Sequence, residues 1–121
     1  MALVVSACAA PTTGKTEASK SDEEVVAERA QARWNAIIAG DLKKAYEFVS
    51  PAGRSVMPYE AFSSGIKQGF HKSAPVEKVK CEVEACEVDL QLEYEYSGSR
   101  FKTAYQEKWV KQDGSWWYLL R

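Results

Sequence analysis

The feature that most constrains this chain is the stretch from Glu87 to Tyr96, where apolar residues alternate strictly with acidic residues and one glutamine. Because successive side chains of a strand point to opposite faces, the alternation predicts a long strand with one apolar face and one largely acidic face. Only the apolar face can lie against a core. The residues of that face are Val88, Leu90, Leu92, Tyr94 and Tyr96.

A turn signal directly after this stretch predicts the pairing of the next strand. With Gly98-Ser99 as a two-residue turn, Glu95 lies opposite Lys102 and Asp89 lies opposite Lys108. Opposite charges then face each other on the solvent side of the sheet, which stabilises an antiparallel pair.

The composition is typical of one globular domain. The chain has 121 residues, of which 45% are hydrophobic and 27% charged, and its formal net charge is −1. Nucleic acid is not an expected partner, because the charge balance offers nothing to a phosphate backbone. No cofactor is expected either, since the sequence has no nucleophile motif, phosphate loop or metal cluster.

Residues 1–20 are predicted to be a signal remnant and a flexible tether ahead of a domain that spans 21–121. The apolar run at the start is too short to cross a bilayer. Its end, Val5-Ser6-Ala7-Cys8, resembles the lipobox of bacterial lipoproteins. The resemblance implies a lipid anchor at Cys8, as the only membrane attachment, and a bacterial cell envelope location facing the periplasm or exterior. The alternative is an apolar segment ahead of a linker, because the basic start of a signal peptide is missing.

The other two cysteines are predicted to pair with each other. A four-residue loop from Glu82 to Ala85 would place Cys81 opposite Cys86 on neighbouring strands. Disulfides persist in exported proteins, so we expect a Cys81–Cys86 bond. A metal site is not expected, because zinc takes four ligands and the chain adds only one histidine, His71.

Three helical segments are predicted before the strands. Residues 21–24 form a capping box at the start of the first helix, and Gly40 ends it. Asp41 is interpreted as the cap of a second helix that Pro51 stops, and a third helix is expected within 57–66. Helices followed by strands indicate an α+β fold, with the helices packed on a curved four-stranded antiparallel sheet. The apolar stripe of the first helix comprises Val26, Ala30, Trp34, Ile37 and Ile38.

The helical half also carries a family resemblance. Trp34 to Asp41, Ala45-Tyr46, Ser50-Pro51 and Arg54 resemble the helical half of the nuclear transport factor 2-like superfamily, and residues 107–116 resemble its closing hairpin. The resemblance implies a cystatin-like cone, with a curved sheet around helices, a pocket at the wide end and frequent dimers through the sheet. It does not imply one function, because the superfamily includes isomerases, dehydratases and transport adaptors.

Glu107 is the acidic residue that the strand pattern places on the apolar face, beside Tyr105 and Trp109. A carboxyl group removed from water can act as a general acid or base. The alternative, which we favour, is a structural bridge to Arg54 or to a tyrosine. Arg33 is expected on the solvent side of the first helix.

The same pattern yields candidate pocket and interface residues. A turn at Asp113-Gly114 sets Val110 opposite Trp117 on the outer face, where they are candidates for a homodimer contact. His71 is predicted to lie in a loop and to be exposed to solvent. Aromatic residues could line a pocket for an amphipathic ligand, although most are expected to be core. The pocket candidates are Trp34, Tyr46, Arg54, Tyr59, Tyr94, Tyr105, Glu107 and Trp109.

These patterns predict the domain of an envelope lipoprotein with a non-catalytic binding or interaction role. Its expected partners are a second copy, a small amphipathic ligand or another envelope protein. The alternative is a small isomerase-like or dehydratase-like enzyme that uses Glu107 as its acid or base.

Overall fold

The computed structural model describes residues 20–120, so Cys8 and most of the predicted tether lie outside the described residues. No helix within 20–120 is both long and apolar enough to span a membrane. The helices are α2 (Asp22–Ala39), α3 (Leu42–Tyr46), α4 (Pro51–Val56) and α5 (Tyr59–Ser64). The strands are β1 (His71–Ser73), β2 (Val76–Glu82), β3 (Ala85–Tyr96), β4 (Ser99–Gln112) and β5 (Ser115–Tyr118).

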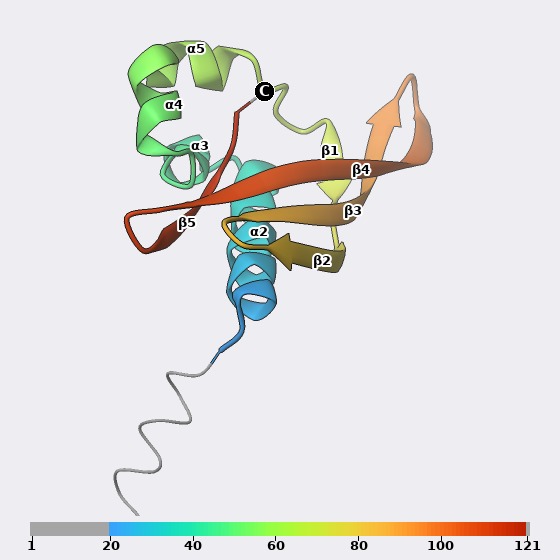
Figure 1. Cartoon of the computed structure of the whole chain (residues 1–121). Coiled ribbons are helices and arrows are strands. Elements are labelled where there is room, and N and C mark those ends of the chain that lie inside the picture. Colours follow the sequence, from blue (N-terminus) through green and yellow to red (C-terminus); the bar gives the residue numbers. More distant parts are fainter. Residues whose placement is uncertain (1–19, 121) are drawn as a thin grey trace, which may run out of the picture.

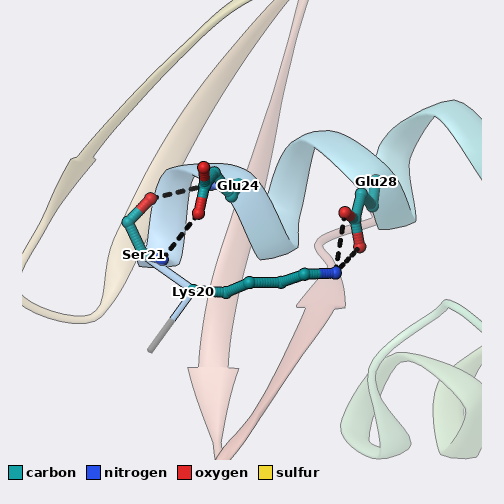
Figure 2. Close-up of polar contacts among 4 residues, drawn as sticks. All are labelled: Lys20, Ser21, Glu24 and Glu28. Carbon is teal, nitrogen blue, oxygen red and sulfur yellow. Dashed lines mark hydrogen bonds and ion pairs between the residues drawn. The ribbon is translucent and has the colours of Figure 1, made fainter. Parts of the chain in front are cut away.

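The start of α2 is fixed by the predicted capping box (Figure 2). The Ser21 hydroxyl accepts a hydrogen bond from the Glu24 amide at 3.1 Å, and the Glu24 carboxylate accepts one from the Ser21 amide at 3.1 Å. Beside it, the exposed Lys20 ammonium lies 2.8 Å from the Glu28 carboxylate. Gly40 ends the helix with φ of 84°, a left-handed conformation that glycine adopts without steric cost.

For the short helices, one prediction from the sequence is confirmed and another is wrong. The Asp41 carboxylate accepts a hydrogen bond from the Lys44 amide at 3.3 Å and so caps α3, as predicted. Pro51, however, does not stop a helix: it opens α4, where the missing amide proton of proline has no intrahelical partner to lose. Ser50 caps α4 by accepting from the Gly53 amide at 3.0 Å.

The strands form one curled antiparallel sheet that is four strands wide, as predicted. Its order is β1-β3-β4-β5, and β2 follows β1 along the same side of β3 (Figure 1). Helix α2 packs against β1, β2 and β3, and the apolar faces of helix and sheet enclose the core. The short strand β1 was not predicted: it contains His71, which is half-buried instead of lying in an exposed loop.

The pairing of β3 with β4 is shifted by two residues from the predicted register. Ser97 and Gly98 form the turn, with φ of 53° and 79°, in place of the predicted Gly98-Ser99. Glu87 therefore faces Lys108, and Asp89 does not. Because side chains alternate with a period of two, a two-residue shift leaves every side chain on its predicted face.

The other two pairings have the predicted register. Cys81 faces Cys86 and the two form the expected disulfide, although the connecting loop is two residues shorter than predicted. At the last turn Val110 faces Trp117, as predicted. The paired residues of this hairpin reach Tyr118, and beyond it the Leu119 amide donates a hydrogen bond to the Lys108 carbonyl at 3.0 Å.

Candidate functional site

A hollow of about 490 Å³ opens between α2, the segment after α5, and the inner face of the sheet. A hollow of similar size, about 450 Å³, beside Gln31 and Pro75 has no aromatic side chain in its wall. The first hollow is thus the better candidate for a ligand with apolar surface. It is lined by Arg33, Trp34, Ile37, residues 65–67, Phe70, His71, Tyr96 and Tyr105.

Aromatic rings form much of the wall of this hollow. The Trp34 ring meets His71 edge-on with centroids 5.0 Å apart, and it meets Tyr105 edge-on at 6.2 Å. Phe70 also packs edge-on against His71, again with centroids 5.0 Å apart. Such edge-to-face contacts stabilise aromatic pairs beyond the area they bury, so these rings form a connected wall.

A buried carboxylate anchors this wall from behind. Glu107 is 2% exposed, as its place on the apolar face predicted. Its Oε2 accepts hydrogen bonds from Arg33 Nη1 at 3.2 Å and from Trp34 Nε1 at 3.0 Å, and its Oε1 accepts one from Trp109 Nε1 at 2.9 Å. The carboxylate is therefore bonded at both oxygens and holds the Trp34 ring in place.

The cation beside Glu107 is Arg33, which corrects two sequence predictions. Arg33 is 5% exposed and does not lie on the solvent side of α2, because its charge is compensated by Glu107. Its guanidinium also lies 3.6 Å from the centre of the Tyr118 ring. Arg54, the predicted partner, instead donates to the Glu47 carbonyl at 3.0 Å.

Burial shifts the acid–base behaviour of two groups in this region. Removal from water lowers the pKa of His71, which favours the neutral imidazole. Burial likewise raises the pKa of Tyr118 to about 12, while the Arg33 charge opposes this rise. The Nδ1 atom of His71 is buried and has no hydrogen-bond partner within residues 20–120. A polar atom in that state is stabilised by a ligand group that can form a hydrogen bond with it.

The predicted pocket residues divide into three groups. Trp34 and Tyr105 line the hollow, whereas Glu107 and Trp109 lie buried behind it. The remaining candidates do not line this hollow. They are Tyr46 and Tyr59, which pack on each other at 5.5 Å, Arg54, and Tyr94, which stacks between Phe70 and Phe101.

Several lining residues were missed from the sequence. Arg33 follows Val26 by seven positions and Ala30 by three, so the helical period places it on the apolar stripe. That spacing is a signal that could have found it. Lys67 and Phe70 lie in a segment without periodicity, and no comparable signal marks them.

The described residues contain no group of three or more histidine, cysteine, aspartate and glutamate side chains arranged to hold a metal ion. The hollow instead offers aromatic and aliphatic surface with a lysine, Lys67, among its lining residues. Its chemistry suits binding of an organic molecule by contact and charge.

Comparisons with known proteins bear on the fold. No family model and no curated protein sequence matches the chain. Among solved structures, an NTF2-like transpeptidase from Campylobacter jejuni matches at 15% identity with a TM-score of 0.56, over 78% of this chain and 96% of that one. A SEC-C motif-containing protein from Rhodopseudomonas palustris matches at 13% identity with a TM-score of 0.58, over 73% of this chain and 70% of that one.

These likenesses, together with the helices followed by a curled antiparallel sheet, define the class: an α+β domain with the nuclear transport factor 2-like cone. At such low identity the likeness establishes the fold alone.

Proposed function

We propose that this domain is a non-catalytic binding module whose aromatic hollow takes a small amphipathic molecule. The observation that carries the proposal is the connected wall of Trp34, His71 and Tyr105, fixed from behind by the buried Glu107 carboxylate. A wall held by such bonds is preorganised, so little entropy is lost when a ligand binds.

The chemistry of the lining supports an apolar molecule with an anionic or hydrogen-bonding end. A volume of about 490 Å³ lies in the usual range for small-molecule sites. Ile37, Phe70 and Tyr105 supply apolar contact, and Lys67 supplies a positive charge on the segment after α5. The Lys67 ammonium lies 5.8 Å from the centre of the Phe70 ring, next to the apolar surface.

The alternative proposal, an isomerase-like or dehydratase-like enzyme, requires Glu107 to exchange a proton with a ligand. Both of its oxygens accept hydrogen bonds from protein donors, and it is not among the residues that line the hollow. A general acid or base must lie within hydrogen-bonding reach of the reacting atom. We therefore propose binding in preference to catalysis.

The proposed setting of the module is the bacterial envelope, with a lipid anchor at Cys8. The lipobox-like run before Cys8 supports this proposal, and so does the Cys81–Cys86 disulfide, because such bonds persist in oxidising compartments. Treatment of cells with labelled palmitate tests it: label should enter the chain and should be lost in Cys8→Ala.

Binding in the hollow is tested with 8-anilinonaphthalene-1-sulfonate, an apolar anion whose fluorescence rises on leaving water. Ile66→Trp fills the hollow and should weaken probe binding by about tenfold or more, which is roughly 1.4 kcal/mol. Ile38→Trp is the matched control, because Ile38 is also half-buried but lines the other hollow.

The control should bind within about twofold of the parent. Equal weakening in both variants, or no change in either, would show that the probe does not occupy the hollow. Tryptophan-monitored urea unfolding of each variant confirms that the compared proteins are folded.

A further inference from the structure

Strand β4 has a long edge that no described strand covers. Strand β5 pairs only with residues 109–112 of β4, although β4 begins at Ser99 (Figure 1). The Lys111 amide points to the β3 side of β4 and donates to the Glu84 carbonyl. The Lys108 carbonyl points to the opposite side of β4 and accepts from the Leu119 amide. Because this direction alternates along an antiparallel strand, the backbone groups of even-numbered residues face the open edge. These residues are Arg100, Lys102, Ala104 and Gln106.

The edge of β5 is closed, which sets β4 apart. The Tyr118 amide donates to the Phe48 carbonyl at 2.7 Å, and the Tyr118 carbonyl accepts from the Ser50 amide at 3.2 Å. Arg29 Nε donates to the Trp116 carbonyl at 2.9 Å. An open row of backbone amides and carbonyls is a template for another strand, and the edge of β5 has no such open row.

The outer face of β4 is positively charged next to this open edge. Arg100 and Lys102 are exposed there, and Lys108 lies further along the same face. On its closed side, β4 already binds an acidic strand: Arg100 Nη1 lies 3.2 Å from the Glu93 carboxylate of β3. The positive side chains of β4 therefore lie between one acidic strand and an open edge.

The inner face of β4 carries two aromatic rings along the same segment, one on each side of the exposed Thr103. Phe101 is 44% exposed, and Tyr105 lies two pleats further along, in the wall of the hollow. A strand added at this edge would place alternate side chains beside these rings. Complementarity thus requires apolar residues on the inner side and acidic residues on the outer side, which is the pattern of β3 itself.

We propose that the open edge of β4 binds an extended acidic peptide segment by strand addition, with acidic and apolar residues alternating. Backbone hydrogen bonds from four residues of β4 supply affinity, and charge on Arg100 and Lys102 selects the acidic sequence. This site is distinct from the proposed ligand hollow, although Tyr105 belongs to the inner face of one and the wall of the other.

The test uses the full chain and a fluorescein-labelled heptapeptide of alternating glutamate and valine. Fluorescence anisotropy should report binding that weakens as salt is added. Amide hydrogen exchange should slow at Lys102, Ala104 and Gln106, whose amides face the edge. A peptide of alternating lysine and valine, and an acidic peptide N-methylated at alternate residues, should each bind about tenfold more weakly or worse.

Variants locate the site. Lys102→Glu should weaken binding of the acidic peptide by about tenfold, whereas Lys78→Glu, the same charge change on the outer face of β2, should change it by less than about twofold. Ile66→Trp should leave peptide binding intact, so failure of the hollow proposal and failure of this one are distinguishable. Melting temperatures of all three verify folding.

Three outcomes would overturn the proposal. Equal binding of the N-methylated peptide would mean that backbone pairing is not involved. Equal weakening by Lys102→Glu and Lys78→Glu would mean that only net charge matters. Self-association of the chain that Ala104→Pro abolishes would make a second copy the occupant of the edge in place of an acidic peptide.

Discussion

Glu107 illustrates how a single buried charge organises the surrounding side chains. The alternation along its strand predicted that Glu107 is buried. It did not predict the ion-pair partner, because a basic residue on a helix is ordinarily expected to face solvent. Arg33 lies on the apolar stripe by spacing, and the acid on the facing strand is what allows it to remain there. The alternative partner, Arg54, instead donates a hydrogen bond to the backbone carbonyl of Glu47.

Replacing Glu107 should destabilise the fold strongly. In Glu107→Gln, Arg33 keeps its charge in a buried position without a counter-charge, so we expect a loss of about 3 to 5 kcal/mol in the free energy of unfolding. Urea unfolding measures it. Glu95→Gln is the control, since Glu95 is exposed beside Arg100, and it should cost less than about 1 kcal/mol. Similar losses in the two variants would contradict a structural role for Glu107.

Tyr118 should make the fold sensitive to alkaline pH. Its pKa is raised to about 12 in the folded chain from an ordinary value of 10, so the folded state holds this proton more tightly than the unfolded state. The resulting stability is complete below pH 10 and is lost as pH rises from 10 to 12. By linkage it amounts to about 2 to 3 kcal/mol at most.

The measurement is urea unfolding at intervals between pH 9 and pH 12, within the range of the expected change. Tyr118→Phe should flatten the alkaline decline, whereas Tyr96→Phe, at a residue 62% exposed, should not. Identical alkaline slopes in the parent and Tyr118→Phe would refute the assignment.

At the scale of elements, turns decide how much the sequence predicts. The pairings joined by the turns before β3 and after β4 were predicted correctly. The first register followed from placing Cys81 opposite Cys86, although the loop is shorter than predicted, and the second followed from the strong turn signal of Asp113-Gly114. Between β3 and β4 the single glycine could occupy either position of a two-residue turn, and Ser97 takes the first position with positive φ. Strand β1 and residues 65–70 show neither a helical nor a strand-like spacing of apolar residues, so the sequence did not reveal that they complete the hollow.

A substitution in the Ser97-Gly98 turn should stabilise the fold. Ser97→Asn places asparagine before Gly98, the pair preferred where both turn residues have positive φ, and should add about 0.5 kcal/mol to stability. Ser99→Asn is the matched control and should add nothing, because Ser99 is already in strand β4. Thermal unfolding compares the two. A gain in Ser99→Asn alone would favour the Gly98-Ser99 turn instead.

At the scale of the whole molecule, the curled sheet separates three surfaces. Its inner face meets α2, and the edge of β4 remains open (Figure 1). The inner face also encloses the core and the aromatic hollow, whereas the outer face is polar except near the last hairpin. There Trp117 is half-buried, with the guanidinium of Arg29 5.6 Å and that of Arg54 5.5 Å from its ring centre. The two guanidinium groups cover part of the Trp117 ring, and Val110 is the residue opposite Trp117 on the neighbouring strand.

The proposed homodimer through this outer face has a direct test. If Val110 and Trp117 form the contact, sedimentation equilibrium should give a mass twice that of the chain, and Val110→Glu should give the single-chain mass because it buries a charge in the contact. Val83→Glu makes the same exchange at a residue 89% exposed on the β2–β3 turn and should leave the dimer intact. A parent protein that sediments as a monomer at about 100 μM would eliminate this contact as a stable interface.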